Sequence, residues 1–341
     1  MKRPQITVVV PTIRENSIQR FLKEWSPLFS RMSTRVLIVE DNPSSTFKLP
    51  NLEYNYSLNH YSWSDIQNDL GRDSWIIPRR TGAIKSYGFW KAYQGGADII
   101  ITLDDDCYPL SSYLPSFIQK NAITSHMENL TKPTQEPAWA SSINAIRPRG
   151  LPYRHTTRTI HSDSIVMSHG LWAHIPDLDG ETQLSIKKLP TIKEYFLHQI
   201  IPIGSYTPLS GMNLAWKREM TPSMYFLLMG ENASGKKWGY DRFDDIWAGI
   251  FTKKICDHIG LRIISGYPVI WHDRQSNALI NKKKEARGKK LNESLWKMVD
   301  QIRLTKSDIP SLYKELAAKL PLRTEYGKHL IRAMQVWASL F

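Results

Sequence analysis

The chain has 341 residues and a formal net charge of +13, with 41% hydrophobic and 23% charged residues. This is the composition of a globular protein, and no apolar run reaches the about 20 residues that cross a bilayer, which excludes a membrane span. The two cysteines exclude a disulfide framework and, with a start that does not resemble a signal peptide, predict a cytoplasmic protein.

The excess of positive charge predicts an anionic partner. Basic residues are spread along the chain and no nucleic-acid-binding motif is present, so the pattern favours a nucleotide diphosphate over nucleic acid. The densest basic run lies at residues 282–290, and its alternative interpretation is the solvated face of a helix.

The first forty residues predict a strand, a helix and a second strand. Residues 5–11 and 35–40 are short β-branched runs, and residues 17–29 between them have the pattern of a helix. Such a βαβ unit is normally right-handed, with parallel strands. Asp41 follows the second strand, where a carboxylate commonly binds a nucleoside. An Asp-Asn-Pro turn at this point is the alternative.

A basic segment precedes the next predicted helix. Residues 44–75 are polar and predict no regular element, and the segment from Arg79 to Lys85 then leads into a helix that ends at Gly95. Basic groups at a helix start can contact phosphate oxygens. We therefore expect Lys85, together with Arg14, to bind the nucleotide.

The central motif is an apolar run, residues 97–103, that ends in three adjacent carboxylates, Asp104, Asp105 and Asp106. The run is rich in β-branched residues and predicts a buried strand of a parallel sheet. Because side chains alternate along a strand, we expect Asp104 and Asp106 to point one way and Asp105 the other. A divalent cation would relieve the repulsion between the carboxylates, and oxygen ligands favour Mg²⁺ or Mn²⁺ over zinc. An acidic surface turn is the alternative.

Two stretches rich in Gly, Pro, aromatic and charged residues predict functional loops. They lie at residues 147–158 and 168–179, after a segment, residues 110–137, that predicts a helix followed by a loop. Neither stretch has the spacing of a metal site or of a catalytic triad. For His169, a core or capping role is the alternative to ligand binding.

Later segments add polar groups beside predicted elements. Gly211 lies in a tight turn before a strand, where the backbone can approach a ligand closely. Asp244 and Asp245 open a helix; they either bind sugar hydroxyls and oppose positive charge on a sugar carbon, or only favour the helix dipole. A strand at residues 262–269 leads to His272, which we expect to complete the coordination of the cation.

The C-terminal part predicts helices. The chain turns helical from residue 293, and residues 309–320 and 326–340 carry apolar side chains at helical spacing. We expect a catalytic domain at residues 1–290 and a helical extension at residues 291–341. The extension would pack on the domain or form the interface of a homo-oligomer.

Together these segments resemble the reversibly glycosylated polypeptide family, also called the UDP-arabinopyranose mutases, from residue 6 to about residue 313. One departure is Asn42, which stands where the family tends to have glycine. The resemblance rests on these blocks: Val10–Arg14, Asp104–Cys107, Arg149–Tyr153, Ser168–Trp172, Ile175–Asp177, Thr182–Gln183, Ser210–Ala215, Arg242–Gly249, Ile255–Leu261, Ser276–Asn277 and Asn281–Glu285.

The resemblance implies an α/β, GT-A-like (Rossmann-like) fold with a mainly parallel central sheet and C-terminal helices. It also implies a UDP-sugar substrate, a divalent metal, Mn²⁺ or Mg²⁺, and interconversion of UDP-L-arabinopyranose and UDP-L-arabinofuranose. Family members glycosylate themselves reversibly on an arginine after the block at residues 149–153. The downstream spacing is longer here, so Arg154 and Arg158 are both candidates.

The candidate site therefore has three parts. The predicted metal ligands are Asp104, Asp106 and His272. The predicted catalytic residues are Arg154, Arg158, Asp244 and Asp245. The predicted nucleotide-sugar-binding residues are Pro11, Thr12, Arg14, Asp41, Lys85, Asp104, Asp105, His169, Gly211 and Asn213.

Four alternatives to a UDP-arabinopyranose mutase stay open. They are a glycosyltransferase that transfers from a UDP-sugar to a separate acceptor, a mutase of a different nucleotide-sugar, a non-catalytic protein that keeps the fold, and, on charge alone, a nucleic-acid binder. Incubation with a UDP-sugar alone separates the glycosyltransferase from a mutase, because a mutase yields the ring isomer with no acceptor present.

Overall fold

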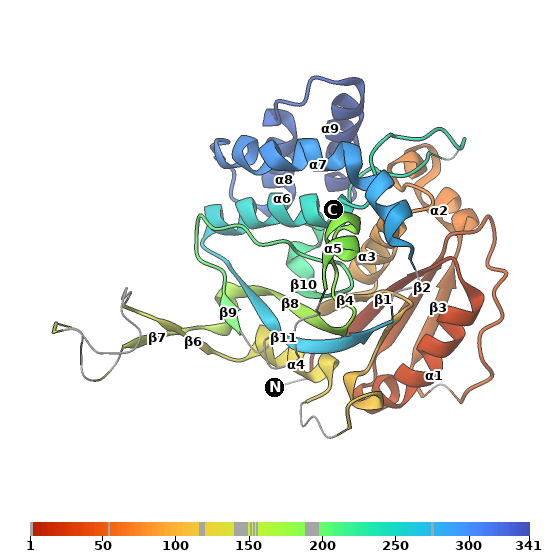
Figure 1. Ribbon diagram of the computed structural model, residues 1–341, viewed down its shortest axis with the longest axis horizontal. Coiled ribbons are helices and arrows are strands. Elements are labelled where there is room, and N and C mark those ends of the chain that lie inside the picture. Colours follow the sequence, from red (N-terminus) through yellow and green to blue (C-terminus); the bar gives the residue numbers. More distant parts are fainter. Residues whose placement is uncertain are drawn as a thin grey trace.

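The computed structural model describes residues 3–53, 55–115, 120–139, 149–150, 152, 154, 156–187, 198–232, 234–273 and 276–341. Within them, one nine-stranded sheet in the order β3-β2-β1-β4-β10-β8-β11-β5, with β9 beside β11, lies at the centre of the fold (Figure 1). Its strands are β1 (Ile6–Thr12), β2 (Arg35–Glu40), β3 (Ser57–Tyr61), β4 (Ile99–Leu103), β5 (Cys107–Tyr108), β8 (Ile165–His174), β9 (Gln199–Ile200), β10 (Asn213–Lys217) and β11 (Arg262–His272).

The predicted α/β class is confirmed, but the sheet is mixed and not mainly parallel: among the described residues, four of its strand pairings are parallel and four are antiparallel. Parallel pairing is concentrated in one half of the sheet. Strands β3, β2, β1 and β4 are parallel neighbours. Strand β10 runs antiparallel to both β4 and β8, whereas β8 and β11 are parallel. The carboxyl ends of β1, β2 and β4 consequently share one edge, which is where open α/β sheets bind ligands.

Alternation along the central strands creates two hydrophobic layers. In β1, Val8 and Val10 pack into one cluster and Val9 into the other. In β4, Ile99 and Ile101 face the first cluster, and Ile100 faces the second. Both faces of the parallel half are therefore buried, as the continuous apolar runs predict.

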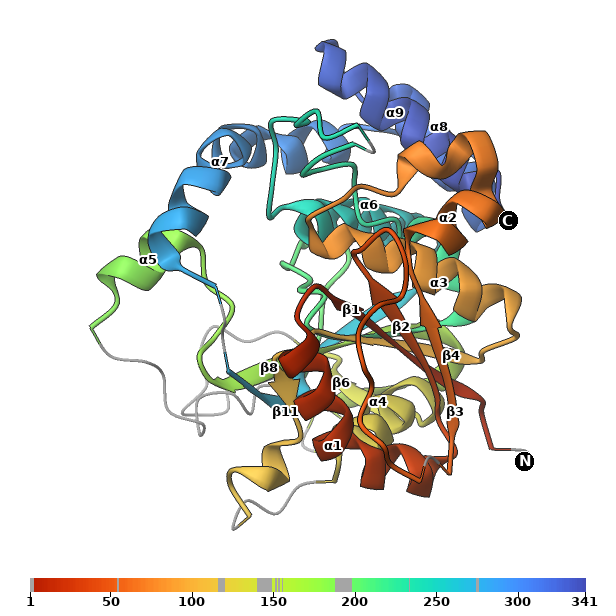
Figure 2. The ribbon, with the colours of Figure 1, turned by 90° about the vertical axis from the view of Figure 1, so that its right-hand side faces the viewer.

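Helices cover both faces of the sheet (Figure 2). The first hydrophobic layer is covered by α1 (Glu15–Met32) and α4 (Ala122–Thr131). The second is covered by α2 (Trp63–Leu70), α3 (Lys85–Gln94), α6 (Asp244–Ile259), α7 (Ala278–Asp300), α8 (Ile309–Lys319) and α9 (Glu325–Ala338). The short helix α5 (Gly180–Ser185) packs beside α7 (Figure 2).

A two-stranded arm projects from the body of the molecule. It consists of β6 (Thr134–Pro137) and β7 (Thr157–Ile160), which pair antiparallel (Figure 1). Residues 132–137, which the sequence predicts as a loop, thus include a strand. The reason is that polar β6 is specified by pairing with β7, and no apolar alternation marks it.

Two other predictions are wrong in detail. The stretch at 44–75, for which no regular element is predicted, contains β3 and α2. The edge strand β3 is half-exposed and has no apolar run from which it could be predicted. Residues 168–172, predicted as a loop, lie inside β8, because pairing with β10 and β11 on its two sides extends the strand through them. Elsewhere, the predicted strands at 5–11, 35–40, 97–103 and 262–269 correspond to β1, β2, β4 and β11.

The C-terminal helices share the second hydrophobic layer with the sheet-covering helices. Leu295 and Val299 of α7, Leu312 of α8 and Trp337 of α9 lie in the same cluster as Trp247 of α6. Helix α7 also runs without interruption across residues 290 and 291, where the sequence predicts a domain boundary. In the described part of the chain, no helix has the length and apolarity that crossing a membrane requires.

Substitution of Gly88 by alanine is expected to destabilise the protein by about 1–3 kcal/mol, because α3 lies directly on the sheet. A Cβ atom at residue 88 would lie 2.4 Å from Val9 Cγ1 and 3.0 Å from Val39 Cγ2. Urea unfolding measures the loss, with Gln94→Ala at the exposed end of the same helix as the control. A Gly88→Ala protein as stable as the control would contradict this account of the packing.

Candidate active site

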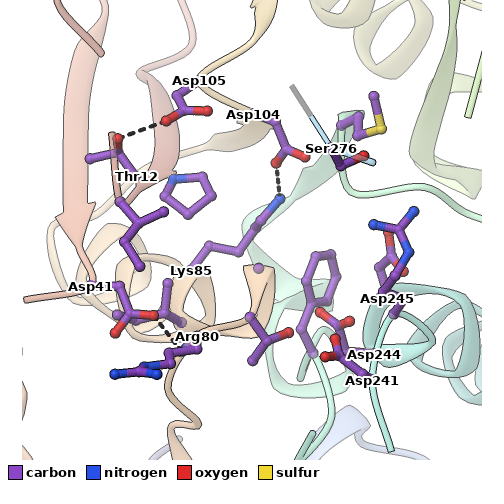
Figure 3. A pocket seen from close by; sticks show the side chains of 18 of the residues that line it. Thr12, Asp41, Arg80, Lys85, Asp104, Asp105, Asp241, Asp244, Asp245 and Ser276 are labelled. Atoms are coloured by element: carbon purple, nitrogen blue, oxygen red, sulfur yellow. Dashed lines mark hydrogen bonds and ion pairs between the residues drawn. The ribbon is translucent and has the colours of Figure 1, made fainter. Parts of the chain in front are cut away.

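A cavity of about 870 Å³ opens at the carboxyl ends of the parallel strands. Its wall includes Thr12 at the end of β1, Asp41 after β2 and the acidic triplet after β4. Residues 177–179 and 241–246 line the cavity as well. Figure 3 shows Lys85 between the strand ends and the carboxylates of Asp244 and Asp245.

The acidic triplet lies in a turn, so the expectation that Asp105 points away is wrong. Strand β4 ends at Leu103, and the turn is closed by a hydrogen bond from the Cys107 N–H to the Asp104 carbonyl. Alternation of side chains therefore stops before the triplet. Asp105 accepts a hydrogen bond of 2.7 Å from the Thr12 hydroxyl (Figure 3). It also forms an ion pair with Arg14. Burial raises the pKa of Asp105 to about 6, against the opposing charge of Arg14.

Asp106 and His272 form the pair that best fits a metal ion. His272 Nδ1 is 2.6 Å from the Ile175 carbonyl oxygen and so donates its proton to it. Its Nε2 faces Asp106 Oδ1 at 3.8 Å. A carboxylate beside a histidine whose other ring nitrogen is held by a backbone carbonyl is an arrangement typical of metal sites.

The two groups do not form a complete ligand set. Among the described residues no group of three His, Cys, Asp or Glu side chains is arranged to hold a metal ion. Asp104, the third predicted ligand, instead contacts Lys85, with 2.5 Å between Oδ1 and Nζ. A cation at Asp106 and His272 would need further oxygen ligands from water or substrate, which Mg²⁺ commonly takes from phosphates.

Lys85 connects the acidic triplet to the loop before β10. Its Nζ also donates to the Gly211 carbonyl at 3.0 Å, and the Gly211 N–H donates to Asp245 at 2.8 Å. Burial of Lys85, which is 3% exposed, opposes its charge, yet the adjacent Asp104 raises its pKa overall. The ammonium group is therefore a fixed positive charge at the floor of the cavity.

Asp244 and Asp245 are adjacent carboxylates at the start of α6, the first buried and the second half-buried. Burial raises the pKa of Asp244 well above its usual value, and the neighbouring charge of Asp245 adds to this effect. Burial, with the charge of Asp177 as the next cause, raises the pKa of Asp245 to about 6. At neutral pH the pair can therefore hold one proton and one negative charge, which suits proton transfer.

Asp41 organises another part of the wall. Its two carboxylate oxygens accept hydrogen bonds from Trp63 Nε1, at 2.7 Å, and from the Arg80 N–H. The Arg79 guanidinium lies 4.3 Å above the Trp63 ring. Asp41, which the sequence predicts to bind the nucleoside, thus holds Trp63 and the basic loop at Arg80 in place. No sequence pattern points to Trp63, which lies in the stretch without a predicted element.

His169 and Asn213 lie behind the cavity wall. His169 Nε2 accepts the Ser210 N–H at 3.2 Å, and Asn213 Oδ1 lies 2.8 Å from Nε2 of the fully buried His126. These groups support the loop that carries Gly211 and do not line the cavity. His126 is not among the predicted residues, because a lone histidine in a helical segment is no signal of such a role.

The two predicted catalytic arginines lie apart from the other site residues. Arg158 belongs to β7 on the arm, where it pairs with Glu136 of β6, and Arg154 is exposed near the same strand. Neither lines the cavity. Leu151, Tyr153 and His155, from the same predicted loop, lie outside the described residues.

Three residues outside the predicted set also line the cavity, on the side formed by residues 177–179, residues 241–246 and α7. Asp177 accepts a hydrogen bond of 2.7 Å from the Ser210 hydroxyl. Arg242 donates from Nε to Glu285 of α7 at 2.8 Å. Arg242 and Glu285 lie inside sequence blocks quoted above, but only the fold brings them together.

Comparison with known proteins matches one family over the whole chain. The family model for the reversibly glycosylated polypeptide matches residues 1–341. UDP-arabinopyranose mutase 3 of Arabidopsis thaliana is 34% identical over 338 residues, covering 96% of this chain and 86% of that protein. Probable UDP-arabinopyranose mutase 1 of Solanum tuberosum is 32% identical over 355 residues, covering 99% and 91%.

Distant likenesses exist among solved structures. A glucosyl-3-phosphoglycerate synthase of Mycobacterium tuberculosis, crystallised with Mn²⁺, UDP-glucose and phosphoglyceric acid, is 13% identical with a TM-score of 0.43, covering 85% of this chain and 79% of that one. A mannosyltransferase of Pyrobaculum calidifontis, crystallised with GDP-mannose and Mn²⁺, is 13% identical with a TM-score of 0.40, covering 99% and 70%.

The buried histidines predict a loss of stability in acid. Burial lowers the pKa of His126 to about 4 and that of His169 to about 3, so both are neutral in the folded protein. In the unfolded chain they take up protons below a pKa of about 6.5. The stability that each neutral histidine contributes is therefore complete above that pH. It is lost as pH falls toward the pKa values of the folded protein, by about 2 kcal/mol per histidine between pH 7.5 and 5.

Urea unfolding of His126→Gln at the two pH values measures this effect. The variant is expected to lose about 2 kcal/mol less stability between pH 7.5 and 5 than the unsubstituted protein. The exposed His161 provides the control His161→Gln, which should keep the original pH dependence. An unchanged pH dependence in His126→Gln would show that this histidine is not held neutral.

Proposed function

The chain belongs to the reversibly glycosylated polypeptide family, and on that premise we propose that it interconverts UDP-L-arabinopyranose and UDP-L-arabinofuranose. The observation that carries the proposal is a cavity at the carboxyl ends of β1, β2 and β4 that gathers an acidic triplet, a buried lysine and a pair of proton-holding carboxylates. Relatives named as UDP-arabinopyranose mutases match nearly the whole chain at 32–34% identity.

Asp106 and His272 are the residues that would hold a divalent cation, Mn²⁺ or Mg²⁺. Bound there, such a cation supplies Lewis-acid neutralisation of a diphosphate leaving group. Asp104, in contact with Lys85, has a different role in this proposal: it keeps the ammonium group directed at the cavity.

Lys85 and Arg14 supply fixed positive charge to the nucleotide. Lys85 is held by Asp104 and the Gly211 carbonyl, so its ammonium group has little freedom to leave the cavity. Arg14 is held by Asp105 and lies 3.3 Å from Asp106. Both cations can stabilise the pyrophosphate as its bond to the sugar breaks, without reorganising at that moment.

Asp244 and Asp245 are positioned for the proton transfers of ring exchange. When the pyranose becomes a furanose, the O4 hydroxyl loses its proton and bonds C1, and the former ring oxygen, O5, gains a proton as its own bond to C1 breaks. A carboxylate and a carboxylic acid side by side can accept the first proton and donate the second. UDP recaptures C1 at the end, so all atoms are conserved.

Arg154 and Arg158 remain our candidates for self-glycosylation. Both are exposed, and Arg158 pairs with Glu136 on the arm. We assign neither arginine a step in the ring exchange, and we take self-glycosylation to be a side reaction of the same activated sugar.

A glycosyltransferase that uses a separate acceptor is the second candidate function, along with a mutase of a different nucleotide-sugar. The size of the cavity leaves room for either. We also propose a cytoplasmic location, with which the two free buried thiols, Cys107 and Cys256, are compatible, and self-association as a homo-oligomer.

Purified protein incubated with UDP-L-arabinopyranose and Mn²⁺, without acceptor, is expected to form UDP-L-arabinofuranose, as resolved by chromatography. Asp106→Asn should lower turnover at least about 100-fold, because it removes a ligand of the cation. The exposed Glu53 provides the control Glu53→Gln, with unchanged turnover.

Two outcomes would contradict the proposal. Transfer of the sugar to an added acceptor, with no ring isomer formed in its absence, would favour the glycosyltransferase. Full activity of Asp106→Asn in the presence of a chelator would remove the metal from the mechanism.

The activity is expected to depend on the ionisation of Asp245. Since burial raises its pKa to about 6, kcat/KM should rise between pH 5 and 7 with a midpoint near 6, as the carboxylate forms. Asp245→Asn should lower kcat by about 10²–10⁴-fold and abolish this rise. Asp163→Asn, at an exposed site, is the control. A variant that retains the midpoint near pH 6 would assign the titration to another group.

A further inference from the structure

Arg242 lies in an unusual backbone conformation at the cavity wall. Its φ is 65°, in the left-handed region that bulky side chains rarely adopt. Among the described residues only three other non-glycine residues have positive φ, and one of them, Arg80, also lines the cavity. Such a conformation persists where the surroundings hold it, and at ligand sites it commonly serves function.

Glu285 of α7 fixes the direction of the Arg242 side chain. Glu285 is only 2% exposed, and its Oε1 accepts the hydrogen bond from Arg242 Nε. Its other oxygen, Oε2, accepts the N–H of Gly180 at 2.8 Å, at the start of α5. One buried carboxylate thus connects the guanidinium to both α5 and α7.

The packing next to this carboxylate leaves little room for adjustment. At Gly288, one turn after Glu285 on α7, a Cβ atom would lie 2.4 Å from the Phe243 ring. At Gly180 a Cβ atom would lie 2.3 Å from the Lys282 backbone N. Helix α7 therefore fixes the segment that carries Arg242 and the segment that carries α5.

Within the described residues, the remaining donors of the Arg242 guanidinium have no protein acceptor. In the described part of the structure, only Nε is hydrogen bonded, so the two terminal nitrogens are available in a cavity that the residue lines. The charges of Asp177 and Asp245 act on the guanidinium as well as that of Glu285. Fixed donors beside fixed acceptors match the hydroxyl groups of a sugar.

The cavity wall around Arg242 is less suited to a pyrophosphate than to a sugar. Asp177 and the negative charge that Asp244 and Asp245 share would repel a dianion, whereas the cations Arg14 and Lys85 and the pair that fits a metal lie at the strand ends. A neutral polyol, by contrast, can accept from Arg242 and donate to Asp177 or Asp245.

We propose that Arg242 binds hydroxyl oxygens of the sugar of the UDP-sugar, and that Glu285 is a positioning residue that holds the guanidinium in the required direction. The inference rests on the proposed nucleotide-sugar function and identifies the part of the substrate that each wall binds. Nucleotide affinity should therefore be separable from sugar affinity by substitution at residue 242.

Calorimetric titration of the full chain with Mn²⁺ and either UDP or UDP-L-arabinopyranose tests this separation. Arg242→Lys is expected to change the Kd for UDP by less than about twofold and to weaken UDP-L-arabinopyranose by about 10- to 100-fold. Glu285→Gln should show the same selectivity. The exposed residues Arg332 and Glu293 provide the matched controls Arg332→Lys and Glu293→Gln, with both affinities unchanged.

The double variant Arg242→Lys with Glu285→Gln distinguishes positioning from general structural support. If Glu285 acts through Arg242, the second substitution should weaken UDP-sugar binding by less than about threefold beyond the first. Additive losses would overturn the role of Glu285. Equal losses for UDP and UDP-sugar, or no binding of UDP-sugar to the unsubstituted protein, would overturn the assignment of Arg242. Selective binding of a UDP-sugar that is not isomerised would overturn only the mutase function.

Discussion

The buried ammonium group of Lys85 is the interaction on which the rest of the site depends. It joins the first turn of α3 to Asp104 at the tip of β4 and to the Gly211 carbonyl before β10. Removing Asp104 would leave this buried ammonium group without its paired carboxylate, which is costly. Because α3 is seated on β1 through Gly88, the packing of a helix on the sheet determines where this charge lies.

The site is rich in carboxylates within a basic protein, and burial gives them different roles. Asp105 has a raised pKa but is held by Thr12 and Arg14, so it serves mainly to fix the arginine. Asp245 is stabilised by the Gly211 N–H and by no directly paired side-chain cation within the described residues, and it shares its surroundings with Asp244. In the proposed function, the first carboxylate is therefore structural and the second exchanges protons. The same residue type serves both purposes because the partners differ.

Sequence patterns predicted the parallel half of the sheet and the residues at its edge, because apolar runs and strand ends are local features. They failed where the determinant was not local. The edge strand β3 has half-exposed side chains and no apolar run. The direction of Asp105 depends on where β4 stops, and His169 lies behind the wall because β8 continues through its neighbours. Glu285 lies in a basic segment, and its partners Gly180 and Arg242 are 105 and 43 residues away.

Helix α7 shows why the C-terminal helices and the cavity form one mechanical unit. Its buried positions continue from Glu285 and Gly288, beside the cavity wall, to Leu295 and Val299 in the hydrophobic layer shared with α8 and α9. A rigid helix transmits any displacement at one end to the other, and the buried face leaves no flexible joint at residue 290 to absorb it. The packing of α8 on α6, and of α9 on α8, therefore helps to hold in place the cavity wall that carries Arg242 and Asp245.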